Sequence, residues 1–168
     1  ATYFPDRVAS LTLIASVGLP MSSSAHVLLK IPLVSDILLR CALWSTVLAG
    51  LEQEWADDSN PHLRDMIESY RDRVLHEPAL ARSLLSTARH FPLESQHATF
   101  AKVGKAPYPV LLVWGDNDRT CPIRNARRIK HEFVKRAKLV VVKGARHCVY
   151  TEFCPQVALA LNTFLKHQ

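Results

Sequence analysis

The second half of the chain contains two short runs of apolar residues, each followed by a polar loop and then by a helical pattern. The first run is 109–114, and the second is 138–143, which is rich in valine. Continuous apolar runs of this length are typical of strands buried on both faces of a parallel sheet. Apolar residues then recur at helical spacing in 124–134 and again from Pro155 to the C-terminus. The pattern therefore predicts strand, loop and helix twice in succession.

The first half predicts one more strand and a group of helices. Residues 8–15 form a short apolar run, which predicts a third strand parallel to the other two. Apolar residues recur at steps of three and four in 34–51, in 63–74 and in 79–88, and Pro78 separates the last two segments. We therefore expect an α/β fold with three parallel strands and a helical segment inserted after the first strand.

Groups suited to proton transfer follow each of the two later strands. Asp116 and Asp118 come directly after the first, and His147 comes after the second. Ligands bind outside the carboxyl ends of parallel strands, so these side chains are candidates for a shared site. Other readings stay open. Asp118 would instead be an acid that caps the helix after Pro122. Asp116 would form that cap or be the acid that pairs with the histidine, and His147 would be an ordinary solvated loop histidine.

Two motifs in these loops resemble the C-terminal end of the α/β-hydrolase fold. The residues from Trp114 to Pro122 follow the pattern Trp-Gly-x-x-Asp-x-x-x-Pro, and Gly144 to His147 follow Gly-x-x-His. By this resemblance Asp118 takes the position of the triad acid and His147 that of the triad histidine, in the order usual for this fold. The residues 4–8 resemble the end of the helix that follows the nucleophile in this fold, and the residues 10–15 resemble the strand after that helix.

The resemblance implies a division of the chain into a core and a lid. Residues 1–18 and 106–168 correspond to the C-terminal half of the core, which is a partial parallel sheet of an α/β-hydrolase. Residues 19–105 correspond to a helical lid, matched only in kind. Apolar helix faces of this sort suit a cover over a hydrophobic substrate pocket, and they equally suit packing on the sheet.

The chain contains no Gly-x-Ser-x-Gly segment, so the third member of a triad is missing. We expect the nucleophile and its oxyanion hole about a dozen residues before Ala1, in the part that would precede the chain. The residues 22–24 are serines without a glycine-flanked turn, nothing obvious in the sequence lowers the thiol pKa of Cys148, and Cys121 is expected to be a small packing residue in the loop that carries Asp118. An upstream aspartate nucleophile, as in dehalogenases and epoxide hydrolases, is a further alternative.

By the resemblance, the whole protein hydrolyses a carboxyl ester through an acyl-enzyme, with a small hydrophobic or acylglycerol-like ester as substrate. Asp118 orients His147, and His147 acts as general base and acid. This chain by itself is then expected to be inactive, and no cofactor or metal is needed. The alternative is a non-catalytic relative, truncated or degenerate, that binds a ligand or a partner.

Net charge and cysteine content restrict the possible functions and locations only slightly. The net charge is +6, but the basic residues from Arg124 to Arg136 lie mostly on one predicted surface helix, and no nucleic-acid module accompanies them. The four cysteines follow neither a disulfide framework nor a metal-binding spacing, which favours reduced thiols and a cytoplasmic location. Asp36 and Arg40 interrupt the apolar segment 33–51, so it does not suggest a membrane span. Peripheral contact of the lid with lipid stays open.

Overall fold

Three parallel strands form the sheet of the computed structural model, which describes residues 1–19, 50–90 and 95–167. Their order is β1-β2-β3, with β1 at Leu11–Ile14, β2 at Val110–Gly115 and β3 at Lys138–Val142. The central strand β2 is buried along its whole length, as expected for an apolar run with a neighbour on each side. The predicted α/β fold with three parallel strands is confirmed. The serines 22–24 and most of the predicted helix 34–51 lie outside the described residues.

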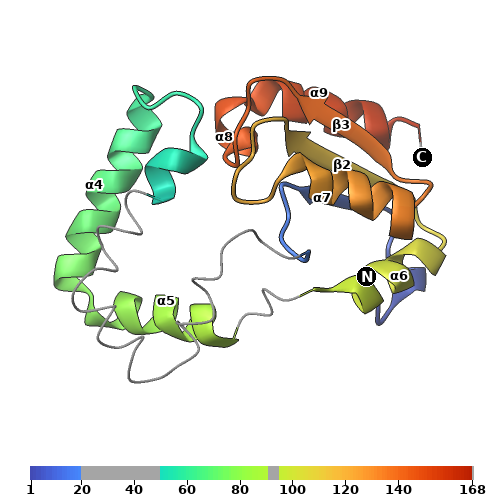
Figure 1. The fold of residues 1–168 in the computed structure, drawn as a ribbon, viewed down its shortest axis with the longest axis horizontal. Coiled ribbons are helices and arrows are strands. Elements are labelled where there is room, and N and C mark those ends of the chain that lie inside the picture. The colour runs from blue at the N-terminus through green and yellow to red at the C-terminus, as the bar shows by residue number, and fades with distance from the viewer. Residues whose placement is uncertain (20–49, 91–94, 168) are drawn as a thin grey trace.

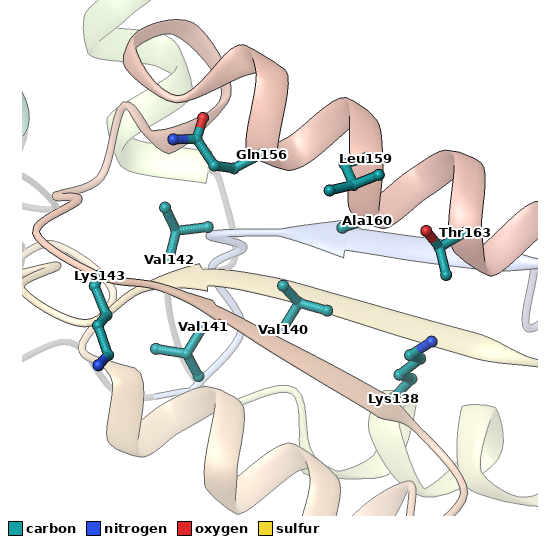
Figure 2. A pocket seen from close by; sticks show the side chains of 9 residues that line it. All are labelled: Lys138, Val140, Val141, Val142, Lys143, Gln156, Leu159, Ala160 and Thr163. Carbon is teal, nitrogen blue, oxygen red and sulfur yellow. The ribbon is translucent and has the colours of Figure 1, made fainter.

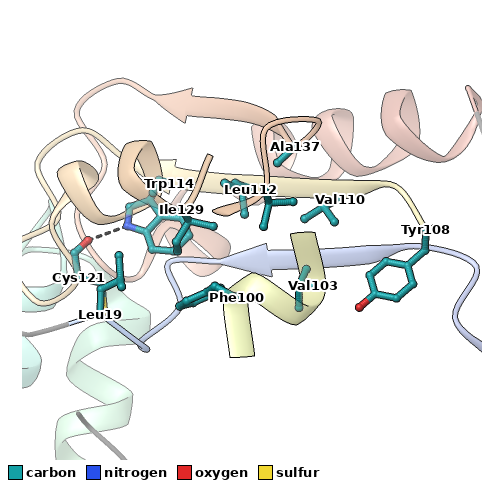
Figure 3. Packing of buried hydrophobic residues seen from close by; sticks show 12 residues of the cluster. Leu19, Phe100, Val103, Tyr108, Val110, Leu112, Trp114, Cys121, Ile129 and Ala137 are labelled. Atoms are coloured by element: carbon teal, nitrogen blue, oxygen red, sulfur yellow. Dashed lines mark hydrogen bonds between the residues drawn. The ribbon is translucent and has the colours of Figure 1, made fainter. Parts of the chain in front are cut away.

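Helices cover both faces of the sheet, because successive side chains of β2 point to opposite faces. On one face, α6 (His97–Lys105) and α7 (Ile123–Arg128) pack against the first of the two hydrophobic clusters that flank the sheet (Figure 3). On the other face, α8 (Val149–Glu152) and α9 (Cys154–Leu165) pack against the second (Figure 1). The side chains of β2 alternate between the two clusters: Val110, Leu112 and Trp114 belong to the first, and Leu111 and Val113 to the second.

Two helices, α4 (Pro61–His76) and α5 (Pro78–His90), extend away from the sheet (Figure 1). Asn60 caps α4, with its side-chain oxygen accepting a hydrogen bond from the His62 N–H at 3.0 Å. Proline stands at the first position of each helix, where its missing N–H costs nothing. The sequence pattern predicted both helices and the break between them. No helix of the described residues is long and apolar enough to cross a membrane.

The segment after Pro122 differs from its prediction as one helix over 124–134. It is α-helical only through α7 and continues as a π-helical turn, Ile129–Phe133, in which the Val134 N–H donates to the Ile129 carbonyl at 2.8 Å. The wider turn presents Phe133 to α6, where its ring stacks on His97 at a centroid distance of 5.2 Å. Hydrophobic spacing alone does not distinguish an α-helix from this local widening.

The helix α6 was not recognised as a separate element in the sequence. It lies within the range 19–105 assigned to the lid, yet Phe100 and Val103 are buried in the same cluster as the side chains of β2. Two buried residues within nine give too short a repeat for a periodicity argument. Tertiary packing therefore decides the position of α6.

Candidate active site

The loop after β2 places Asp118 beneath the surface. Trp114, at the end of the strand, is fully buried, and its indole N–H donates to the Cys121 carbonyl at 2.6 Å. The Cys121 N–H in turn donates to Oδ1 of Asp118 at 2.7 Å. These two bonds close the loop on itself, and they leave the Asp118 side chain with 0 % exposure and its second oxygen unused by the loop.

The loop after β3 crosses over the end of β2. Gly144 has φ +78°, a conformation that L-residues rarely adopt, and its N–H donates to Oδ1 of Asp116 at 2.8 Å. The Asn117 N–H donates to the Ala145 carbonyl at 3.0 Å. A side chain at Gly115 would collide with the carbonyls of this loop, so glycine is required for the close approach. The crossing brings residue 147 to the acid loop.

His147 and Asp118 meet at the carboxyl end of the sheet, where Nδ1 of His147 lies 3.0 Å from Oδ2 of Asp118. A carboxylate only accepts hydrogen bonds, so Nδ1 carries the proton and Nε2 of the neutral ring keeps its lone pair. The histidine side chain is 20 % exposed, and the aspartate is completely buried. An imidazole in this state is oriented by an acid and has a nitrogen able to accept a proton from a reactant.

The environment of His147 favours its cationic form. Burial lowers the pKa of the imidazole, but the hydrogen bond and the negative charge of Asp118 act in the opposite direction, with a further contribution from Glu54. The net effect raises the pKa of His147 above its ordinary value of 6.5. The site thus stabilises the charge that the ring would acquire on accepting a proton.

The structure separates the roles of the two aspartates that the sequence left open. Asp116 is exposed and serves the crossing of the loops, whereas Asp118 faces the histidine. The helix-cap interpretation of Asp118 is wrong, because its Oδ1 accepts from Cys121 in the loop and α7 itself has no side-chain cap. One carboxylate thus closes the turn and contacts the imidazole.

Glu54 is a residue of the site that sequence reasoning missed. It ends a helical stretch, 50–54, and its main-chain carbonyl accepts a hydrogen bond from the Cys148 N–H at 3.0 Å. Burial raises the pKa of Glu54, while the charge of His147 and the Thr120 hydroxyl oppose the rise. In the sequence it stands in an ordinary polar run, Glu52 to Glu54, and no local signal sets it apart.

The thiols near the site are protected from ionisation. Burial raises the pKa of Cys121 to about 12, and the same cause raises the pKa of Cys148 to about 12. A thiol with so high a pKa supplies almost no thiolate near neutral pH, which agrees with the expectation that neither is the nucleophile. Both are free, as is Cys154. No group of three or more potential metal ligands occurs in 1–19, 50–90 or 95–167.

Two hollows differ in their relation to the site. One, of about 460 Å³, lies over the acid loop and is lined by Asp118, Arg119, Ile123 and Arg146 among others. A second, of about 480 Å³, lies between the free edge of β3 and α9, where Val140 and Val142 point toward α9 (Figure 2). Only the first adjoins the histidine–aspartate pair, and the second is lined by no acid, histidine or cysteine.

Comparison with known proteins identifies the family and the fold of the chain. A family whose members are described as TAP-like protein matches residues 75–167, which is more than half of the chain. An esterase from Thermogutta terrifontis has a TM-score of 0.71 at 18 % identity, over 98 % of this chain and 58 % of its own.

Two further solved structures are hydrolases of other substrates. A meta-cleavage product hydrolase from Pseudomonas fluorescens gives a TM-score of 0.73 at 17 % identity, over 100 % of this chain and 60 % of its own. The 2-hydroxy-6-oxo-6-phenylhexa-2,4-dienoate hydrolase from Rhodococcus sp. gives 0.68 at 20 % identity, over 96 % and 58 %. These likenesses concern the fold, and the chain spans about three fifths of the length of each relative.

Proposed function

The chain belongs to the TAP-like family of the α/β-hydrolase fold, and on that premise we propose that it supplies the acid and the histidine of a carboxyl-ester hydrolase. The observation that carries the proposal is the 3.0 Å contact between Nδ1 of His147 and the buried carboxylate of Asp118. Asp118 orients the ring, and His147 acts as general base and then as general acid.

The proposed reaction passes through an acyl-enzyme. Nε2 of the neutral His147 accepts the proton of a serine hydroxyl while the serine oxygen bonds to the carbonyl carbon of the ester. The imidazolium then returns the proton to the alcohol oxygen as the bond between that oxygen and the carbonyl carbon breaks. Water attacks the acyl-enzyme by the same route, with its proton passing through Nε2 to the serine oxygen. Asp118 stabilises the imidazolium at both stages and takes no proton itself.

The nucleophile belongs, in this proposal, to a Gly-x-Ser-x-Gly segment that precedes Ala1 in a longer protein, together with the amides that bind the oxyanion. Two observations support this. The chain spans only about three fifths of its structural relatives, and the buried thiols of Cys121 and Cys148 are poor nucleophiles. An upstream aspartate fits the same acid and histidine pair and is the alternative nucleophile.

We propose a hydrophobic carboxyl ester as the substrate class. The apolar cluster of Trp55, Leu63 and Cys148 adjoins the histidine loop, with Met66 and Ile67 of α4 packed against it. An apolar surface at this position suits an acyl chain beside the reacting carbonyl. One of the structural relatives is named as an esterase, which is consistent with this class and does not establish it.

A fluorophosphonate probe tests the proposal, because it labels a serine that a neighbouring histidine activates. We expect labelling of a longer protein that joins a Gly-x-Ser-x-Gly segment to this chain, and no labelling of the 168-residue chain. The variant His147→Ala should abolish labelling, whereas the control His131→Ala, an exposed residue of the π-helical turn, should not. An unlabelled protein with an intact serine segment would refute the active-serine mechanism.

The second candidate function is a non-catalytic protein that binds a hydrophobic ligand or a partner. One observation favours it: this chain covers only about three fifths of the length of its structural relatives. A chain without the nucleophile would keep an apolar surface for binding but would have no complete triad. A longer coding sequence that contains neither a serine nor an aspartate elbow would select this function. Ester turnover that depends on His147 would eliminate it.

A further inference from the structure

The hollow between β3 and α9 lies along the free edge of β3, in the place where one more strand would continue the sheet. Its lining includes side chains from both faces of the strand, because Val140 and Val142 point toward α9 and Val141 points away from it (Figure 2). A hollow enclosed between one face of β3 and α9 would be lined by only one of these rows. The hollow therefore extends beside the strand as well as against α9.

Backbone groups of β3 face this hollow without a strand to pair with. The Asp116 N–H donates to the Val142 carbonyl at 3.2 Å, so the backbone groups of residues 138, 140 and 142 face β2. Those of Leu139 and Val141 face outward, where no strand of the described residues pairs with them. A lipid chain would cover these N–H and C=O groups without hydrogen bonds, whereas an extended peptide pairs with them. The edge therefore favours a peptide strand over an apolar small molecule.

Apolar side chains beside the edge suit the centre of such a strand. Val141 is 39 % exposed and Leu159 of α9 is 68 % exposed. Figure 2 shows Leu159 directed from α9 toward β3, with Ala160 beside it. An added strand would place alternate side chains against Leu159 on one face and beside Val141 on the other. Contacts of this alternating kind give specificity to peptides that bind at a sheet edge.

Lysines stand at the two ends of the edge and determine the charge that its occupant needs. Lys138 begins β3 on the row that faces α9, and Lys143 follows β3 on the opposite row. Among the described residues, no acid lines the hollow. A second copy of the chain, paired antiparallel at this edge, would place a lysine of each copy at both ends of the shared edge, where the like charges repel. The lysines thus discourage pairing in general and favour a strand that has an acid at each end.

We propose that the free edge of β3 is a docking site for an extended segment of a partner protein, with apolar residues at its centre and two acidic residues five positions apart. The spacing follows from the edge itself, because Lys138 and Lys143 are five positions apart. In an added strand the residues opposite these lysines have the same separation and point to opposite faces, as the lysines do. The proposal goes beyond the hydrolase function and does not depend on it.

Two hexapeptides with blocked ends test the proposal, Glu-Val-Thr-Val-Thr-Glu and the matched Lys-Val-Thr-Val-Thr-Lys. In an NMR titration of the 168-residue chain, the acidic peptide should shift the amide signals of Leu139 and Val141 and slow their hydrogen exchange. It should bind at least about fivefold more tightly than the lysine peptide, because two cross-strand pairs change from like to opposite charge. Added salt should reduce this difference, since both ends of the edge are exposed.

An exchange of charge tests whether the lysines select the peptide. In a variant with both Lys138→Glu and Lys143→Glu, the lysine peptide should bind more tightly than the acidic one. The matched control changes two exposed lysines of α6, Lys102→Glu and Lys105→Glu, and should keep the original preference at the same net charge. Leu159→Gln should weaken the binding of both peptides, because it removes the apolar contact from α9.

Equal binding of the two peptides to the unsubstituted chain would overturn the proposal, and so would signal shifts that spare Leu139 and Val141. This comparison needs no variant, so it decides the matter even where a substituted chain fails to fold. A sedimentation experiment that finds a dimer with protected Leu139 and Val141 amides would show a second copy at the edge and would also overturn it. Dodecanoate that displaces the acidic peptide would assign the hollow to an apolar carboxylate, with the same consequence.

Discussion

Asp118 divides its two carboxylate oxygens between structure and chemistry. Oδ1 accepts the Cys121 N–H and closes the loop, and Oδ2 faces Nδ1 of His147. The loop bond fixes the carboxyl plane, so the second oxygen is already directed at the imidazole before any reactant binds. Such preorganisation is what an orienting acid needs, because a side chain that had to reorient would lose part of its effect.

The first prediction concerns the replacement Asp118→Asn. The amide keeps an oxygen for the Cys121 N–H but presents N–H to the ring, so Nδ1 becomes the acceptor and Nε2 carries the proton. We expect the pKa of His147 to fall in an NMR titration, because the hydrogen bond and the charge that raise it are both lost. In a longer, active protein the labelling rate should fall on the order of 10⁴-fold.

Asp116→Asn is the matched control for that replacement. Asp116 bonds to the Gly144 N–H and does not face the ring, so the titration of His147 should stay close to that of the unsubstituted chain. Equal shifts in both variants would contradict the assignment of Asp118 as the orienting acid.

The second prediction concerns stability against pH. The pKa of His147 is raised in the folded chain, so folding is favoured by the protonated ring. This contribution is fully present below the ordinary value of 6.5 and is lost as the pH rises through the folded-state pKa. In urea unfolding, the stability difference between the chain and His147→Gln should therefore be larger at about pH 5 than at about pH 9. A difference that grows with pH would contradict the raised pKa.

At the scale of the elements, the site depends on how closely two loops pass each other. The loop after β3 lies directly on the end of β2, and Gly115 leaves room for the carbonyls of Ala145 and Arg146. The Asn117 N–H bonds to one of these carbonyls, so the crossing is both a steric and a polar contact. The glycine of the first motif therefore serves the placement of the histidine of the second.

The third prediction tests this crossing with Gly115→Ala. The added methyl collides with backbone carbonyls that have no room to move without shifting the loop, so we expect a loss of about 1–3 kcal/mol in the free energy of unfolding. The displaced His147 should also titrate nearer its ordinary pKa. Gly50→Ala is the control, because nothing lies within 4 Å of the added carbon and alanine stabilises a helix by up to about 1 kcal/mol. Equal stability of both variants would contradict the steric argument.

At the scale of the whole molecule, the two edges of the sheet differ in how well they are protected from pairing with another chain. β2 pairs on both sides, whereas β1 and β3 each have one partner among the described residues. The free edge of β3 has a lysine at its first residue and Lys143 just past its end, a charge placement that discourages edge-to-edge pairing. The edge of β1 has no charged residue within the strand. In the proposed longer protein, the strand before the nucleophile would cover it.

The fourth prediction is a pattern of amide exchange. In a parallel pair the N–H groups of alternate residues point to one neighbour. The N–H group of Leu11 donates to the carbonyl of Pro109, just before β2, and that of Ala15 to the carbonyl of Val113 in β2, so those of Thr12 and Ile14 face the free edge. In the 168-residue chain these two amides should exchange at least about tenfold faster than those of β2 in hydrogen-exchange NMR. Equal protection would show that another chain or segment pairs with β1.

Local sequence patterns were sufficient to predict the three strands and to find the two motifs in the loops that follow β2 and β3. The apolar run of β2 predicted burial on both faces, and Gly115 and Gly144 predicted the ends of β2 and β3 to within two residues. The loops after parallel strands meet at one edge of a sheet, so the proximity of residues 118 and 147 also followed from the predicted topology. These inferences are reliable because periodicity and turn chemistry act over a few neighbouring residues.

Only the tertiary structure decided the features that depend on distant contacts. The spacing of 124–134 did not reveal the π-helical turn, α6 was too short for a repeat, and Glu54 had no local mark. Which aspartate meets His147 was likewise settled by the loop crossing at Gly115. The physical reason is common to all of these features. Each depends on packing between segments far apart in the chain, and a pattern of neighbouring residues carries no information about such contacts.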